Sequence, residues 1–116
     1  MIEKAPNKET IMTSSTLYDL VNIIKERRQS TAEKSYTKSL IEAGTGKCCK
    51  KLGEEATEMI IAALSEDQTS FKEEAADVLY HYLVLLEAKN LKLSEIEAVL
   101  EQRMGQSGHE EKASRS

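Results

Sequence analysis

Apolar residues recur at intervals of three and four along most of the chain, which is the spacing of one face of an α-helix. Leu17, Leu20, Val21 and Ile24 form the first example. Short polar segments separate such stretches, so the fold is expected to be all-α, an antiparallel bundle of four to five helices. The predicted helices cover residues 16–28, 35–44, 47–64, 70–90 and 94–104.

The residues at the ends of these stretches predict where the helices begin and end. Thr16, Ser70 and Ser94 are predicted N-caps, because each has an acidic residue three positions later, as in a capping box. Asn90 suits the C-terminal end of the fourth helix. The polar residues 65–69 form a short turn, so the third and fourth helices should pack as a hairpin.

The third and fourth helices each carry a polar stripe beside an apolar face, and residues of such stripes are expected to point into a cleft of the bundle. The predicted core positions of the third helix are Leu52, Ala56, Met59, Ile60, Ala63 and Leu64. Its polar stripe contains Lys51, Glu55, Glu58 and Ala62. The stripe of the fourth helix contains Glu74, Asp77, His81 and Val84.

Two pairs of carboxylates dominate these stripes. Glu55 and Glu58 lie three residues apart, as do Glu74 and Asp77, so each pair shares one helix face. A hairpin would bring both pairs around one small volume, where like charges repel unless a cation compensates them. Carboxylate oxygens are hard ligands that suit Mg²⁺ or Mn²⁺. The pattern alone leaves two interpretations open, a metal site and a solvated acidic face.

Composition and charge narrow the function classes. The chain has 116 residues, enough for one domain, with a net charge of −4. An acidic chain is a poor candidate for nucleic-acid binding. No apolar run approaches the ~20 residues that a membrane span needs, and the start of the chain lacks an apolar signal-peptide stretch. A cytoplasmic protein is expected, with the adjacent Cys48 and Cys49 as reduced thiols on a helix.

Three segments of the sequence resemble one enzyme family. They are Ser35-Tyr36-Thr37, Lys51-Leu-Gly-Glu-Glu-Ala-Thr-Glu58 and Glu74-Ala-Ala-Asp77-Val-Leu-Tyr80-His81. Together they resemble the phosphoribosyl-ATP pyrophosphatases, a branch of the all-α nucleotide pyrophosphatases named after MazG. The resemblance covers about Leu17 to Met104. It implies an enzyme domain over 15–104 with an extension over 1–14 outside the match. The lack of apolar periodicity predicts that this extension is flexible, and the polar composition of 105–116 predicts a disordered tail.

The resemblance implies Mg²⁺-dependent hydrolysis of phosphoribosyl-ATP to phosphoribosyl-AMP and pyrophosphate, the second step of histidine biosynthesis. Glu55, Glu58, Glu74 and Asp77 would hold Mg²⁺, and Lys51 would contact phosphate oxygens. Glu55 and its neighbour Glu54 are the catalytic candidates, and which carboxylate acts as the base stays open. Lys47 and Lys50 are weaker candidates that more simply face solvent.

Four further residues are candidates for contacting the substrate. Tyr36 and Thr37 lie in a segment that resembles the family's substrate-side loop, although Ser35 there would also cap a helix. His81 is either a packed residue or a substrate contact, and Tyr80 is either core or a ligand contact. The thin core and the relatives of this superfamily imply a homodimer or a higher homo-oligomer.

Two other functions compete with this one. A house-cleaning pyrophosphatase for ordinary or damaged nucleoside triphosphates would use the same carboxylates. A non-catalytic helical interaction module would leave them facing solvent without a metal.

Overall fold

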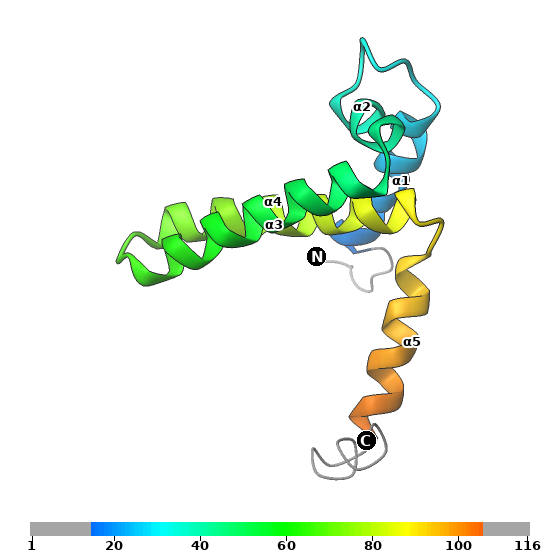
Figure 1. Cartoon of the computed structure of the whole chain (residues 1–116). Coiled ribbons are helices and arrows are strands. Elements are labelled where there is room, and N and C mark those ends of the chain that lie inside the picture. The colour runs from blue at the N-terminus through cyan, green and yellow to red at the C-terminus, as the bar shows by residue number, and fades with distance from the viewer. Residues whose placement is uncertain (1–14, 106–116) are drawn as a thin grey trace.

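The computed structural model describes residues 15–105, and these fold into five α-helices without a strand (Figure 1). The all-α prediction is confirmed. The predicted N-terminal extension and all of the predicted tail beyond Gly105 lie outside the described residues. Across residues 15–105, the helices are too short or too polar for any of them to cross a membrane. The helices are α1 (Thr16–Arg28), α2 (Tyr36–Ala43), α3 (Thr45–Leu64), α4 (Gln68–Ala88) and α5 (Leu93–Met104).

Helices α3 and α4 form a long antiparallel hairpin, as predicted, and it is the largest packing contact between described elements (Figure 1). Helices α1 and α2 pack on the end of the hairpin that holds the start of α3 and the end of α4. Helix α5 leaves that same end and turns away from the hairpin. Among the described residues, bundle packing is therefore confined to one end, and no described helix covers the other half of the hairpin.

The apolar core lies where α1, α2, α3 and α4 meet. Partly buried residues of α5, Leu93 and Ile96, pack against its edge. Apolar burial on this scale is the main stabilising contribution to a small helical domain. The buried members of the core cluster are Ile24, Leu40, Cys48, Leu83, Val84 and Leu86.

The predicted core stripe of α3 is wrong for its second half. Ile60 and Leu64 are 57% and 85% exposed, and the buried residues of α3 are Cys48 and Ala62. The periodicity identified the helix correctly, but no described element covers this part of the hairpin. These apolar side chains therefore remain on the surface of the single chain.

Ser35 caps α2 as predicted, but the other three predicted N-caps are wrong, each by one to three residues. Helix α1 is capped by Ser15, whose Oγ accepts from the Tyr18 backbone N–H at 3.2 Å. Helix α5 begins earlier than predicted, and there the Glu95 carboxylate accepts from the Lys92 backbone N–H at 2.9 Å. In both cases a neighbouring polar residue satisfies the free amides of the first turn.

The cap of α4 shortens the predicted turn. Asp67 accepts from the backbone N–H groups of Thr69 and Ser70 at 3.0 and 3.3 Å. A carboxylate that reaches two amides caps the helix better than the Ser70 hydroxyl, which instead donates to Asp67. Only residues 65–67 therefore join α3 to α4, which holds the two helices close together.

Two residues with positive φ end helices at the packed end of the molecule. Gly44, with φ of 102°, separates α2 from α3, and Asn90, with φ of 61°, follows α4 as predicted from its residue type. Arg28 stabilises the C-terminal end of α4, because its Nη1 donates to the carbonyl and carboxylate of Glu87 and to the Asn90 side chain.

Candidate metal-binding and substrate site

An open groove lined by carboxylates runs along the exposed half of the α3–α4 hairpin. Its volume is about 630 Å³. The apolar faces of the two helices meet in the hairpin, so the stripes beside those faces converge along one edge. The lining residues are Glu54, Glu55, Thr57, Glu58, Glu74 and Asp77.

Three of these carboxylates form a compact group. Glu55, Glu74 and Asp77 each offer one oxygen, and the three oxygens lie within 4.8 Å of one another. Burial raises the pKa of the Glu74 carboxyl, and the negative charges of Asp77, Glu55 and Glu58 raise it further. The three carboxylates therefore repel one another when all of them are ionised. Three converging carboxylate oxygens are a donor set that fits Mg²⁺ or Mn²⁺.

Glu58 and Glu54 line the groove but stand outside this compact group. Glu54 faces Lys51, and its Oε1 lies 3.2 Å from the ammonium Nζ. This hydrogen bond is the main cause that lowers the pKa of the Glu54 carboxyl. Lys51 also lies 4.0 Å from Glu55 Oε2, so one ammonium group stands beside the three-carboxylate group.

Four of the five predicted substrate-binding residues gather beside the end of this groove, and the fifth is Lys51. The hydroxyl groups of Thr37 on α2 and Tyr80 on α4 are hydrogen-bonded to each other. Tyr36 is 55% exposed, and its ring meets the His81 ring edge-on with centroids 6.4 Å apart. Tyr80 packs edge-on against the same imidazole at 4.9 Å. The structure therefore brings Tyr36, Thr37, Tyr80 and His81 into one cluster.

His81 connects this cluster to the carboxylates. It is buried, and its Nδ1 lies 2.9 Å from the backbone carbonyl of Asp77. A carbonyl oxygen only accepts, so Nδ1 is the donor of this hydrogen bond. Among the described residues Nε2 has no hydrogen-bond partner. The imidazole is therefore both packed and polar, and the two interpretations of His81 from the sequence are not exclusive.

The sequence pattern missed one residue of the groove. Thr57 lies between the Glu54–Glu55 pair and Glu58, and its Oγ1 donates to the carbonyl of Gly53 at 3.0 Å. Its hydroxyl thus satisfies the helix backbone. A threonine in an acidic stripe has no distinguishing spacing, so only the three-dimensional arrangement identifies it.

A family model and several known proteins match this chain, and all of them point to the same family. A family model described as phosphoribosyl-ATP pyrophosphohydrolase matches residues 17–104. Phosphoribosyl-ATP pyrophosphatase 1 of Rhodopseudomonas palustris is 51% identical over 90% of this chain and 97% of its own length. The phosphoribosyl-ATP pyrophosphatase of Methylobacterium nodulans is 54% identical over the same shares of the two chains. That of Azorhizobium caulinodans is 52% identical over 86% of this chain and 92% of its own length.

The matched region spans all five helices almost completely and contains every carboxylate of the groove. The identity extends over nearly the full length of each of these relatives, so it concerns the whole domain and not one motif. The chain belongs to the phosphoribosyl-ATP pyrophosphohydrolase family.

Proposed function

We propose that this protein hydrolyses phosphoribosyl-ATP to phosphoribosyl-AMP and pyrophosphate, the second step of histidine biosynthesis. The observation that carries the proposal is the group formed by Glu55, Glu74 and Asp77 beside Lys51. Such a group provides a metal site next to a cation, which is what a triphosphate needs. The names of the relatives support this choice of substrate.

Glu55, Glu74 and Asp77 would hold Mg²⁺, with Glu58 along the same groove. When bound, the ion would neutralise charge on the phosphate oxygens. Lys51 adds a hydrogen-bond donor for the same oxygens. Phosphoryl transfer depends mostly on positioning and electrostatics, so an arrangement of charges held by two rigid helices is suited to it.

A carboxylate must also accept the proton of the attacking water. The water oxygen forms a bond to the α-phosphorus, and the bond from that phosphorus to the α–β bridging oxygen breaks, so pyrophosphate leaves. Glu54 and Glu55 are the two candidates for the base. The bond with Lys51 lowers the pKa of the Glu54 carboxyl and weakens it as a base.

The cluster beside the groove would position the rest of the substrate. Tyr36 is exposed enough to stack on or bond a ligand. His81 is buried together with its unpaired Nε2, so it would act through its edge-on contact with the Tyr36 ring. Thr37 and Tyr80 already satisfy each other, so their contribution is to hold α2 against α4. In this arrangement Tyr36 is the direct contact, and His81, Thr37 and Tyr80 support it.

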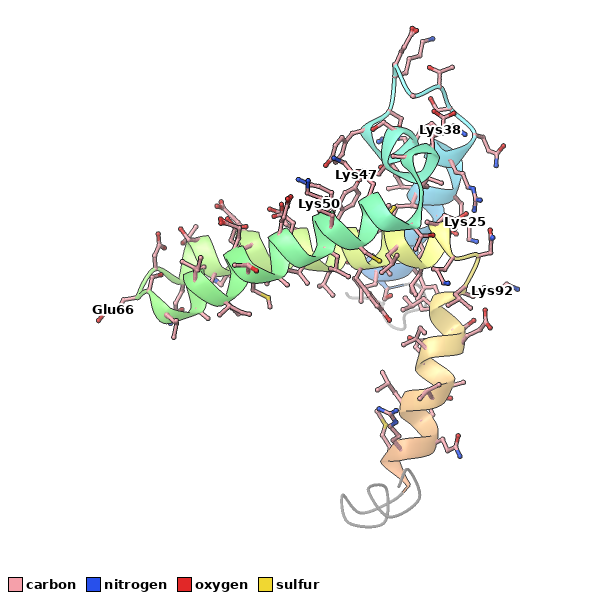
Figure 2. All side chains as sticks on the ribbon, in the orientation of Figure 1. Lys25, Lys38, Lys47, Lys50, Glu66 and Lys92 are labelled. Atoms are coloured by element: carbon pink, nitrogen blue, oxygen red, sulfur yellow. The ribbon has the colours of Figure 1, made fainter. Side chains whose placement is uncertain are left out.

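Pyrophosphate release from phosphoribosyl-ATP tests the function, with ATP and dCTP as parallel substrates. We expect release from phosphoribosyl-ATP with Mg²⁺, none with excess EDTA, and a loss in Glu55→Gln on the order of 100-fold in kcat/KM. Glu66→Gln is the matched control, because Glu66 is an exposed acid at the far tip of the same hairpin (Figure 2).

Other outcomes of this assay would replace the proposal. Preferential release from ATP or dCTP would make the protein a house-cleaning pyrophosphatase. No release from any of the three would leave the interaction module as the better explanation of the acidic face.

A homodimer or higher homo-oligomer in the cytoplasm is the further part of the proposal. Ile60, Ile61 and Leu64 leave apolar surface on the hairpin, and Val99 and Met104 do so on α5, which has no buried residue. Both cysteines are free, as expected in a reducing compartment. Sedimentation equilibrium at micromolar concentration should give at least twice the 13.0 kDa of one chain, and a single-chain mass would contradict it.

A further inference from the structure

A row of charged residues on α3 runs into the carboxylate groove, and the sign of its charge changes along the helix. Six charged residues follow one helix face at intervals of three and four positions, so they form a continuous row. The row is basic next to α2 and acidic towards the hairpin tip. Its members are Lys47, Lys50, Lys51, Glu54, Glu55 and Glu58.

The acidic half of this row has a function in the proposed reaction, but the basic half is only partly used. Lys51 pairs with Glu54 and Glu55. Among residues 15–105, Lys47 and Lys50 form no ion pair within 4 Å, and both are exposed. Figure 2 shows their side chains leaving α3 on the side where α2 lies. Both still act on Glu54, because each contributes to lowering the pKa of its carboxyl.

The position of these lysines is unfavourable for the helix itself. Lys47 has Lys50 and Lys51 as its neighbours three and four residues away, and like charges at these spacings destabilise a helix. The first turn of α3 carries no acidic residue, and its cap, Gly44, has no side chain to bond the free amides. Positive charge near a helix N-terminus opposes the macrodipole. A local arrangement that is poor for stability is typical of a position that serves a ligand.

An anion beside Lys47 and Lys50 would remove this repulsion. Phosphoribosyl-ATP carries a phosphate that ATP lacks, on its phosphoribosyl group, at the opposite end of the molecule from the triphosphate. At a rise of ~1.5 Å per residue, Lys47 and Lys50 lie about 12 Å and about 7.5 Å along α3 from Glu55, the α3 member of the compact group. The order of groups in the substrate therefore matches the order of charges on α3. The isolated phosphate would lie at the lysines, and the triphosphate would lie at the carboxylates and their metal.

We propose that Lys47 and Lys50 form a second phosphate subsite, which binds the phosphate of the phosphoribosyl group while the triphosphate lies at the carboxylates. The inference rests on the proposed function and adds the element that distinguishes phosphoribosyl-ATP from a common nucleotide. Lys51 lies at the boundary of the two subsites. Lysine recognises phosphate as a mobile point charge, so exposed side chains are suited to this contact.

Binding of two related products tests the subsite without depending on turnover. Phosphoribosyl-AMP carries the phosphoribosyl phosphate and AMP does not, and calorimetry in Mg²⁺ buffer measures the Kd of each. For Lys47→Gln/Lys50→Gln we expect Kd of phosphoribosyl-AMP to rise at least about tenfold, as for lost hydrogen bonds to a charged group. The Kd of AMP should stay within about twofold of the wild-type value, a smaller change than the loss of one such hydrogen bond would cause.

Two further variants make the comparison specific. Lys34→Gln/Lys89→Gln removes the same charge from exposed lysines off this row, and it should bind both ligands like wild type. Lys47→Arg/Lys50→Arg keeps the charge and should restore the affinity for phosphoribosyl-AMP. The unfolding temperature of the glutamine variant should stay near that of wild type, because the relief of like charges at the start of α3 offsets the lost attraction to Glu54.

Each remaining outcome would overturn the subsite. Equal weakening of AMP and phosphoribosyl-AMP would place the lysines at the nucleotide phosphate, and unchanged affinities would make them solvated surface residues. Failure of the proposed function would be separate, since wild type would then release no pyrophosphate from phosphoribosyl-ATP. A preference for phosphoribosyl-AMP over AMP that depends on Lys47 and Lys50 would still be measurable in that case.

Discussion

Glu55 on α3 and Glu74 on α4 bring carboxylate oxygens within 4.8 Å of each other, together with an oxygen of Asp77. Two separate helices supply this contact, and the short link over residues 65–67 holds them together. The pKa of Glu74 is raised by burial first and then by the charges of Asp77 and Glu55. The folded chain therefore concentrates negative charge that a divalent cation would neutralise.

Metal binding should consequently stabilise the fold through Glu74. Mg²⁺ or Mn²⁺ at about 100 times its Kd is expected to raise the unfolding temperature of wild type by on the order of 10 °C. Glu74→Gln should abolish this shift, and in EDTA it should unfold no earlier than wild type, because it removes one of the repelling charges. Differential scanning fluorimetry measures both effects. Glu66→Gln should respond to metal like wild type, and a full metal shift in Glu74→Gln would contradict the site.

The hydrogen bond between Thr37 and Tyr80 predicts a coupled loss of stability. Tyr80→Phe leaves the buried Thr37 hydroxyl without this partner, and Thr37→Val does the same to the tyrosine, each costing about 1–3 kcal/mol. The double variant should lose clearly less than the sum, because neither hydroxyl is then left unpaired. Urea unfolding of the four proteins gives the coupling energy. Strict additivity would show that the two hydroxyls do not stabilise each other.

Asp67 predicts a dependence of stability on acid pH. Its hydrogen bonds, from the Ser70 hydroxyl first and then from backbone N–H groups, lower its pKa below the ordinary value of 3.8. The unfolded chain therefore binds the proton first, so this contribution is complete above 3.8 and is lost as pH falls through the folded pKa. Asp67→Asn keeps a good cap without the charge and should lack this part of the acid dependence. Identical profiles for both proteins down to acid pH would exclude the assignment.

Gly53 and Gly44 predict opposite effects of adding a methyl group. Gly53 lies inside α3, and a Cβ there would meet no atom within 4 Å, so Gly53→Ala should stabilise by about 0.5–1 kcal/mol. Gly44 has φ of 102°, and Gly44→Ala should destabilise by about 1–3 kcal/mol. Chemical denaturation tests the pair. A destabilising effect of Gly53→Ala would show that another molecule approaches α3 at this position.

The sequence was sufficient to predict the helices and the hairpin because both depend on local patterns. The period of apolar residues located each helix to within a few positions, and the polar link made α3 and α4 neighbours. The cap positions were less predictable, since Ser15 and Asp67 compete with Thr16 and Ser70 for the same free amides. Residue type alone does not decide which of two nearby polar residues caps the helix, because the backbone conformation before the first turn decides it.

The packing of the hairpin was not predictable from the same pattern. Ile60 and Leu64 have the spacing of core residues, yet no described helix covers them. Periodicity reports that a face is apolar and does not report what lies against it. For the same reason, the spacing of Glu55, Glu58, Glu74 and Asp77 predicted one acidic groove, whereas only the structure separates the compact group from Glu58.

The apolar core and the carboxylate groove occupy different halves of the hairpin. Val84 and its buried neighbours hold the half that α1 and α2 cover, whereas Glu55 and Glu74 lie in the half that stands alone. Backbone amides of the second half should therefore exchange with solvent deuterium faster than those around Val84, because local opening there breaks few contacts. A divalent ion and the substrate would add contacts in this half, so in the proposed enzyme their binding should slow amide exchange there.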